Sequence, residues 1–313
     1  MPDPLVSILI PVYNCRPYLD AAMSSILAQT YKDFEVVVID DGSTDGSSED
    51  LARFAQQDSR VRIITQSNQG LPKTLLRGQQ LCCGKYIARM DGDDIATPER
   101  LEKQMAFMEA NPDVGICGAF ARTVDADGDP MRIFTPPVDY AGIDKKLMEG
   151  RASAIIHPLA FMRKEALEKA GGYRTDEELE DLGLFLRMAE TTKMANIPEV
   201  MLDYRMHLKS TNYQRRMRHA ELTQQIVELA WKRSHLPGTC PKLQMPHRDD
   251  DLVLITADWA RTAFTGRFYN TGWKHTWRVL GQRPFAASTW CEFARTARWG
   301  IYCQFKKEKP QAA

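Results

Sequence analysis

The sequence lacks an excess of charge of either sign, because its 41 Lys and Arg residues balance its 41 Asp and Glu residues. The total charge therefore gives no indication of a nucleic acid or another highly charged partner. No run approaches the ~20 apolar residues that a membrane-spanning helix needs. The opening stretch, MPDPLVSILIPVYN, has no basic segment and soon reaches an apolar run. We therefore expect neither a signal peptide nor a transmembrane helix.

Paired cysteine motifs are also missing. The seven cysteines are an odd number, and no two of them have the spacing of a zinc site. Reduced thiols in a cytoplasmic protein are the simplest interpretation. They are Cys15, Cys82, Cys83, Cys117, Cys240, Cys291 and Cys303.

The chain does contain a regular alternation of apolar runs and helical patterns. Its 313 residues, 43% of them hydrophobic, suffice for one large domain with an appendage. Short apolar runs typical of buried strands stand between segments with helical spacing of apolar residues. This alternation predicts an α/β fold with a mostly parallel sheet and helices on both faces. The runs are VSILIPV (6–12), FEVVVID (34–40), VRIIT (61–65) and KYIARM (85–90).

Two of the helix starts carry capping signals. Ser47 and Asp50 have the spacing of a capping box and predict a helix that begins at Ser47. Thr97 followed by Pro98 predicts the cap and first turn of a later helix.

Acidic residues follow two of the predicted strands. Asp40 and Asp41 end one run, and Asp91, Asp93 and Asp94 follow another. The carboxyl ends of strands in an open α/β sheet form the ligand crevice, so both clusters are predicted to face one cleft. Grouped carboxylates are suited to hold Mg²⁺ or Mn²⁺ beside a diphosphate. A plain turn explains DDGSTDGS equally well, but explains the three acids of MDGDD less well.

A further acidic pair, Glu180 and Asp181, begins the segment EDLGLFLRMAE. Leu184, Phe185 and Met188 form an apolar face after Asp181, which predicts a helix that starts at this pair. From the residues alone, these acids are best explained as complements of the helix dipole.

Several segments together resemble glycosyltransferase family 2, which comprises inverting nucleotide-sugar transferases with the GT-A fold. The resemblance covers residues 5–212, which we therefore expect to be the catalytic domain. The matching segments, in order, are VSILIPVYN, ILAQTYKDFEVVVIDDGSTDGS, NQGLPKTLLRGQQLCCGKYIARMDGDDIATPERLEKQ, HPLAFMRKEAL, GGY and ELEDLGLFLRMAE.

The resemblance implies which residues bind the donor and the metal. Asp93 matches the direct ligand of Mn²⁺ or Mg²⁺, and Asp91 a contact to the ribose or to a water on the metal. Asp94 would lie just behind them. The nucleotide-sugar would be held by Pro11, Tyr13, Asn14, Asp40, Asp41, Asp91 and Gly92, with Ser43 nearby.

The resemblance also implies the catalytic pair. Asp181 matches the general base, which takes the proton from the attacking hydroxyl, and Glu180 matches the residue that holds the acceptor. The metal would stabilise the departing nucleoside diphosphate, so no acid is needed for the leaving group. A single displacement inverts the anomeric centre.

Four other residues have competing interpretations. His207, within a segment resembling the family's Tyr-Arg-x-His-x-x-Ser pattern with Arg205, is implied as a further metal or phosphate contact. A structural or surface histidine is the alternative. His157 is better explained as a packed histidine than as an acceptor contact. Lys73 and Arg77 share a helix face and either meet the diphosphate or are solvated.

The segment DADGD at residues 125–129 resembles the start of a calcium loop. Counting from Asp125, the sixth position is Pro130 and the twelfth is Pro136, where the loop needs Gly and Glu. We therefore predict a connection between two strands instead.

The family motifs stop at residue 213, and residues 213–313 are predicted to be a helical region. Five of the six tryptophans lie at or near residues 261–309. Basic residues mixed with tryptophans suit an anionic membrane surface, which a lipid-linked acceptor would favour. A helical appendage with solvated charges is an equal alternative. The segment has only two acids, Glu292 and Glu308, against Arg261, Arg267, Lys274, Arg278, Arg283, Arg295, Arg298, Lys306, Lys307 and Lys309.

The prediction is therefore a metal-dependent glycosyltransferase with a nucleotide-sugar donor, most often UDP-linked in this family, and a carbohydrate or lipid-linked acceptor. We place it in the cytoplasm, peripheral to the inner face of the cell membrane, with no nucleic-acid partner. The processive members' Gln-x-x-Arg-Trp signature is missing, which favours single additions. The rivals are an inactive nucleotide-sugar-binding module and a sugar-nucleotide nucleotidyltransferase. The latter should have a glycine-rich loop after its first strand, where this chain has PVYNCRPY.

Overall fold

The structure is a computed structural model that describes residues 4–208, 219–243 and 251–305. The chain divides into two compact units. Unit 1 comprises Met1–Ala121, Thr135–Tyr204 and Arg215–Gln244, and unit 2 comprises Arg122–Phe134, Arg205–Gln214 and Met245–Ala313. Each unit is described by itself.

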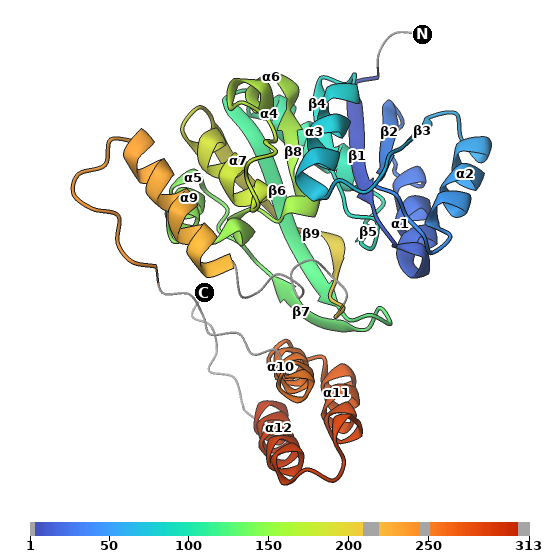
Figure 1. The fold of residues 1–313 in the computed structure, drawn as a ribbon, viewed down its shortest axis with the longest axis vertical. Coiled ribbons are helices and arrows are strands. Elements are labelled where there is room, and N and C mark those ends of the chain that lie inside the picture. The colour runs from blue at the N-terminus through green and yellow to red at the C-terminus, as the bar shows by residue number, and fades with distance from the viewer. Residues whose placement is uncertain (1–3, 209–218, 244–250, 306–313) are drawn as a thin grey trace. The chain divides into compact units, whose positions relative to one another are not determined.

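A mixed β-sheet forms the centre of unit 1 (Figure 1). Four neighbouring strands in the order β3-β2-β1-β4 are parallel, as the alternation of strand and helix predicts. Beyond β4 the sheet continues with antiparallel pairs, β4 with β8 and β8 with β6, while β9 pairs antiparallel with β5. The strands are β1 (Val6–Val12), β2 (Phe34–Asp40), β3 (Val61–Thr65), β4 (Tyr86–Arg89), β5 (Ile95–Ala96), β6 (Val114–Val124), β7 (Pro130–Phe134), β8 (Phe161–Arg163) and β9 (Lys193–Arg205).

Helices cover both faces of this sheet. Leu9, Val37 and Ile39 belong to a core cluster with side chains of α3, α5, α6, α7 and α9. The alternate strand residues, such as Ile8 and Val36, are fully buried as well, so the opposite face is also covered. The helices are α1 (Arg16–Leu27), α2 (Ser47–Gln57), α3 (Leu71–Leu81), α4 (Arg100–Ala110), α5 (Tyr140–Met148), α6 (Lys164–Lys169), α7 (Glu180–Ala189) and α9 (His219–Arg233), with 3₁₀ turns at Ala152–Ala154 and His157–Leu159.

Two predicted helix caps differ from the structure. Helix α2 begins at Ser47 as predicted, but Gly46 is its N-cap residue, and the Asp45 carboxylate accepts hydrogen bonds from both the backbone N–H and the hydroxyl of Ser47. The predicted capping box is therefore wrong, because the N–H and hydroxyl of Ser47 donate to the upstream Asp45 carboxylate and not to Asp50. Helix α4 begins at Arg100 after Glu99, so Thr97 is not its cap.

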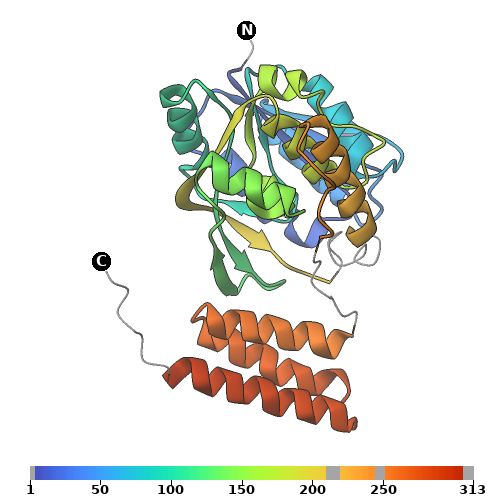
Figure 2. The same cartoon turned by 90° about the vertical axis from the view of Figure 1, so that its left-hand side faces the viewer.

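Unit 2 combines the end of β6, the strand β7 and three helices. Helices α10 (Leu252–Thr265), α11 (Tyr269–Gln282) and α12 (Ala287–Phe305) pack against one another (Figure 2). Met131 of β7 is buried against Ile255, Trp259 and Ala263 of α10, which joins the hairpin to the helices. None of the described helices is long and apolar enough to cross a bilayer.

Small residues allow the three helices of unit 2 to approach closely. The ring of Phe264 lies where a side chain at Gly272 or at Gly300 would have to be, within about 3 Å of an added Cβ at either glycine. The compact units and the predicted division at residue 212 differ in three segments: the hairpin of residues 122–134 and the stretch that begins at Arg205 belong to unit 2, and α9 belongs to unit 1. The functional division itself stays a prediction.

Candidate active site

Two loops after the parallel strands β1 and β2 are tied together by hydrogen bonds. Val12 pairs with Asp40 at the ends of these strands. The Asn14 side-chain oxygen accepts a hydrogen bond from the backbone N–H of Thr44 at 2.8 Å, and the backbone N–H of Asn14 donates to the Ser43 hydroxyl at 3.1 Å. Asn14 has a φ of +53°, the left-handed conformation that asparagine tolerates. The sequence-predicted residues Pro11 to Asn14 thus lie beside Asp40 to Ser43.

Asp40 and Asp41 shape these loops from within. The Asp40 carboxylate accepts hydrogen bonds from the Ser43 backbone N–H at 3.0 Å and from the Ser48 hydroxyl at 2.5 Å. Asp41 accepts bonds from Gln66 Nε2 at 2.7 Å and from the backbone N–H groups of two residues at the start of α3. Both acids are buried, so their first role is to hold the loops that border the strand ends.

Tyr13 is available to a ligand, because 50% of its surface is exposed at the end of β1. The same loop approaches the acidic cluster. A Cβ added to Gly92 would lie 3.3 Å from Val12 and 3.5 Å from the Cys15 sulfur. Burial and, after it, the negative charge of Asp93 raise the pKa of the Cys15 thiol to about 12. The loop after β1 therefore borders the acids after β4.

Three carboxylates gather after β4, as the sequence predicts. Asp91, Asp93 and Asp94 each place a carboxylate oxygen within 4.8 Å of the others. Asp91 is additionally paired with the buried Arg89, whose Nη2 lies 2.5 Å from Asp91 Oδ1. The guanidinium offsets part of the repulsion among the three carboxylates.

Glu180 and Asp181 form the first turn of α7, as predicted. Burial and, to a smaller extent, the charge of Asp181 raise the pKa of Glu180 to about 8. The charges of Asp181 and Asp93 likewise act on Asp91, whose pKa is raised first of all by burial. The two acidic groups, far apart in the sequence, therefore share one electrostatic field.

A buried polar layer beneath the acids was missed by the sequence reasoning. The Tyr173 hydroxyl lies 2.8 Å from Nε2 of His157, which confirms that His157 is a packed histidine. Burial lowers the pKa of His157, and the nearby Arg89 charge lowers it further. Burial raises the pKa of Tyr173, and the charges of Glu180 and Asp181 raise it further. An arginine inside the buried strand YIAR was the available signal, because a buried charge requires a partner.

Other predicted contacts have different surroundings. The Arg77 guanidinium donates to Gln66 Oε1 at 2.9 Å, and Gln66 bonds Asp41, so Arg77 supports the loop network. Lys73 is exposed. His207 lies in unit 2, and its role as a metal ligand stays a prediction.

The donor set after β4 fits a hard divalent cation. Three carboxylates with oxygens in mutual reach supply the oxygen ligands that Mg²⁺ and Mn²⁺ prefer. The Arg89 contact favours the ionised form of Asp91, which a metal or a water on it requires.

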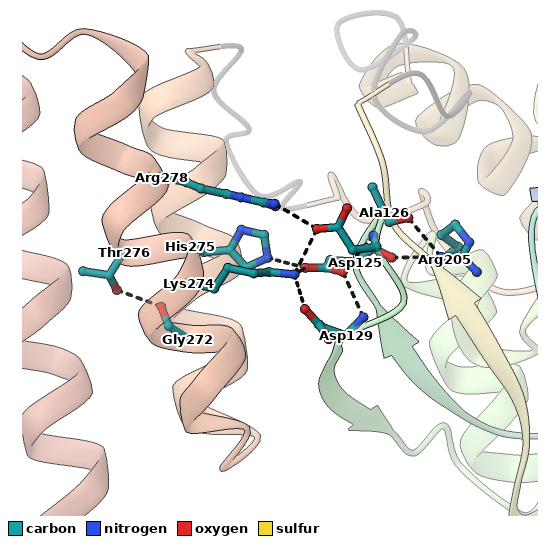
Figure 3. Close-up of polar contacts among 10 residues, drawn as sticks. Asp125, Ala126, Asp129, Arg205, Gly272, Lys274, His275, Thr276 and Arg278 are labelled. Atoms are coloured by element: carbon teal, nitrogen blue, oxygen red, sulfur yellow. Dashed lines mark hydrogen bonds and ion pairs between the residues drawn. The ribbon is translucent and has the colours of Figure 1, made fainter. Parts of the chain in front are cut away.

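A second acidic cluster, in unit 2, is already neutralised by basic side chains. Asp125, Asp127 and Asp129 surround the ammonium of Lys274, which bonds all three carboxylates. His275 Nε2 lies 2.9 Å from Asp125 Oδ2 (Figure 3). The segment DADGD connects the strands β6 and β7, as predicted. The Lys274 ammonium occupies the position among the three carboxylates that a metal cation would otherwise take.

The comparisons with known proteins agree with this geometry. Residues 7–171 match the model of glycosyl transferase family 2. An uncharacterized glycosyltransferase of Haemophilus influenzae is 33% identical over 67% of this chain and 68% of its own length. The amylovoran biosynthesis glycosyltransferase AmsE of Erwinia amylovora is 31% identical over 72% of this chain and 85% of its own length.

Solved structures show the same fold. The mannosyltransferase PcManGT of Pyrobaculum calidifontis, in complex with GDP-Man and Mn²⁺, aligns with a TM-score of 0.55 and 19% identity over 98% of this chain and 88% of its own. Residues 1–349 of S. aureus TarS, in complex with UDP-GlcNAc, align with a TM-score of 0.55 and 15% identity over 96% and 91%. The fold class predicted from the sequence, a GT-A type α/β fold with a helical C-terminal region, is confirmed. The chain belongs to glycosyl transferase family 2.

Proposed function

We propose that this family 2 glycosyltransferase moves a sugar from a UDP-sugar to an acceptor hydroxyl by a single inverting displacement. The observation that carries this proposal is the shared field of two acidic groups, Asp91 and Asp93 after β4 and Glu180 and Asp181 at the start of α7. A transferase needs both: one group to receive the donor diphosphate and one to activate the acceptor.

The donor is held at the ends of β1, β2 and β4. Tyr13 stacks on the nucleotide base with its exposed ring. Asn14 and Asp40 fix the two loops that border the base and ribose. Gly92 lets the acidic loop approach Val12 closely, since a side chain there would press on it. PcManGT and TarS bind nucleotide sugars, which supports a donor of this class.

Asp93, with Asp91 and His207 as further contacts, would hold Mn²⁺ or Mg²⁺. When bound, the cation neutralises the negative charge that develops on the departing diphosphate. Arg89 holds the Asp91 carboxylate by an ion pair and opposes the rise in its pKa that burial causes.

Asp181 acts as the general base. The acceptor oxygen forms a bond to the anomeric carbon while the bond from that carbon to the diphosphate oxygen breaks, and the acceptor proton passes to Asp181. Glu180 keeps its proton near neutral pH, because burial and the charge of Asp181 together raise its pKa to about 8. It therefore donates a hydrogen bond to the acceptor while its neighbour accepts the proton.

We further propose that the product belongs to a cell-surface polysaccharide or glycolipid, as the name of AmsE suggests for that relative. A lipid-linked acceptor would be reached at a membrane surface, so we propose that the enzyme acts in the cytoplasm, peripheral to the inner face of the cell membrane.

Replacing Asp181 with Asn tests the catalytic assignment. We expect kcat to fall by roughly 10²–10⁴-fold, the usual contribution of a positioned base, with donor affinity unchanged. UDP-glucose, UDP-galactose, UDP-GlcNAc and GDP-mannose are offered with Mn²⁺ or Mg²⁺. Donor binding is read as a thermal shift and turnover as donor hydrolysis. Chelation by EDTA should abolish the shift, because binding to the folded state stabilises it only while the site is intact.

The control is Glu178→Gln, an exposed acid shortly before α7, which should leave both readouts unchanged. A nucleotide-sugar-binding module would keep the thermal shift and show no turnover even with native Asp181. Formation of a nucleotide sugar from a sugar phosphate would instead indicate a nucleotidyltransferase. If no donor shifts the melting temperature in a metal-dependent way, the transferase proposal fails.

A further inference from the structure

Helix α12 has its large apolar side chains on the outside of unit 2. Its buried residues, Thr289, Glu292, Thr296 and Gly300, recur at helical spacing and form the inward face. The outward side carries bulky residues instead, with exposed fractions of 41–77%. They are Trp290, Trp299, Ile301, Tyr302 and Phe305. We call these residues, with Arg295 and Arg298, the outer face of α12.

This arrangement reverses the usual pattern of a surface helix, whose apolar stripe faces the core. The reason lies in the inward face. Gly300 receives the ring of Phe264, and Glu292 is buried between the guanidinium groups of Arg261 and Arg295. Small and polar residues are thus required inside, and the aromatic residues are left outside. Exposed apolar area of this kind marks an interaction surface.

The outer face is also basic. Of the five basic residues in 269–305, Lys274, Arg278 and Arg283 form ion pairs with acids elsewhere in unit 2, so the positive charge of the outer face comes from Arg295 and Arg298. Arg295 retains 72% exposure of its side chain although it bonds Glu292 at 2.8 Å. Arg298 is exposed and has no partner among the described residues.

An open hollow of about 540 Å³ lies on this face beside α10. Its lining combines three guanidinium groups with two aromatic rings: Arg261, Arg295, Arg298, Trp299 and Tyr302. The rings of Trp299 and Tyr302 are 5.5 Å apart. Guanidinium groups bind phosphate oxygens, and the amphipathic rings of Trp and Tyr favour the boundary between headgroups and acyl chains.

We propose that the outer face of α12 binds the surface of an anionic lipid bilayer, with the arginines at the lipid phosphates and Trp290, Ile301 and Phe305 in the acyl boundary. A second copy of the chain fits this face less well than an anionic bilayer does. A two-fold contact would bring the arginines of one copy against those of the other, and like charges across an interface oppose association. The inference rests on the proposed peripheral location and names the surface responsible for it.

The test compares two double variants of the full chain in vesicle flotation. Arg298→Glu with Ile301→Ser alters the outer face, and Lys232→Glu with Leu229→Ser makes the same chemical changes at exposed positions of α9. Vesicles are pure phosphatidylcholine or equal parts phosphatidylcholine and phosphatidylglycerol. The wild type should bind only the anionic vesicles. One basic residue contributes about fivefold to the partition coefficient, so the α12 variant should lose at least about tenfold, and the α9 variant should match the wild type.

Flotation needs neither donor nor metal. The membrane inference can therefore fail while the transferase proposal stands, and the transferase proposal can fail while the membrane inference stands. Equal binding of the α12 variant and the wild type would overturn the inference. So would self-association of the wild type without vesicle binding, which would assign the face to a second copy. No vesicle binding by the wild type, together with a lower melting temperature of the α12 variant, would show that the chain itself covers the face, and would overturn the inference as well.

Discussion

At the scale of single residues, Arg89 is the group that joins the two halves of the candidate site. It is buried at the end of β4 and pairs with Asp91 at 2.5 Å. Its charge also acts on His157, Tyr173 and Glu180. Its Nε and Nη1 atoms are buried without a hydrogen-bond partner, so the arginine is held by the charges around it.

We expect Arg89→Met to destabilise the protein by about 3–5 kcal/mol, because Asp91 loses the cation that balances it. The variant should also need more Mn²⁺ for half-maximal activity. Adding Asp91→Asn to Arg89→Met should restore part of the stability but not the activity. Urea unfolding and metal titrations of the double-mutant cycle measure both effects.

The control for this cycle is Arg53→Met, a half-exposed arginine in ion pairs on the surface of α2. The Arg53→Met change should lower the free energy of unfolding by no more than about 0.5 kcal/mol. Purely additive effects of the changes at Arg89 and Asp91 would refute the coupling.

Glu180 carries a second prediction at this scale. Its folded pKa is raised to about 8, above the ~4.3 of a free glutamate. As the pH rises, the unfolded chain therefore releases the Glu180 proton before the folded chain does. The free energy of unfolding of the wild type consequently falls between about pH 5 and about pH 8. Glu180→Gln removes this loss, so its melting temperature should exceed that of the wild type by an amount that grows over the same interval.

The activity of the wild type should fall as the pH rises above about 8, because ionised Glu180 no longer donates to the acceptor. Glu180→Gln should lack this decline. Thermal melts and rate measurements across pH 5 to 9 test both expectations, with Glu178→Gln as the exposed control. A constant stability difference at every pH would disprove the assignment.

At the scale of elements, the hairpin of unit 2 is fixed to α11 by ion pairs. The Asp125 carboxylate is fully buried and accepts bonds from His275 and Lys274 (Figure 3). Arg205 donates from its guanidinium to the backbone carbonyls of Asp125 and Ala126 at 3.2 and 3.1 Å. Burial opposes ionisation of Asp125, but the bonds from His275 and Lys274 outweigh it and lower its pKa.

Asp125→Asn should therefore destabilise unit 2 by about 3–5 kcal/mol at neutral pH, since Lys274 loses the buried anion with which it pairs and the hydrogen-bonded contact with His275 is disturbed. Because the folded pKa is depressed, the contribution of Asp125 is present above about pH 4 and is lost as the pH falls below it. The penalty of the variant should shrink accordingly in acid. Tryptophan fluorescence reports this unit, which holds five of the six tryptophans.

Asp258→Asn, an exposed acid on α10, is the matched control and should unfold like the wild type. Equal penalties for Asp125→Asn at pH 3 and pH 7 would contradict the role given to its charge.

The elements show why some of the fold could be predicted and some could not. The strands β1, β2, β3 and β4 were predicted because parallel buried strands read as continuous apolar runs. The antiparallel strands β8 and β9 left a weaker signal, because β8 has only three residues and β9 is interrupted by exposed and partly exposed positions. The cap of α2 was wrong because Asp45, not Asp50, bonds Ser47, and both acids stand at plausible distances along the chain.

At the scale of the whole molecule, the chain combines a sheet of the family 2 type with three helices of unit 2, α10, α11 and α12, that lie outside the family match. The match ends at residue 171, and α7 with Glu180 and Asp181 follows directly. The similar solved structures cover nearly the whole chain. At 15–19% identity they establish the fold alone, and they assign no function to the residues of unit 2. The outer face of α12 is therefore an inference from this chain's own residues.

The sequence by itself determined the alternation of strands and helices, the acids at the ends of β2 and β4, and the acidic pair that starts α7. These features are local, because apolar spacing and helix signals extend over a few residues. Only the tertiary structure decided that Arg89 balances Asp91, that Lys274 fills the cluster of Asp125, and that α12 turns its aromatic residues outward. Each of these features depends on which segments pack against one another. Contacts between residues that are distant in the sequence produce no periodic pattern from which the partners could be predicted.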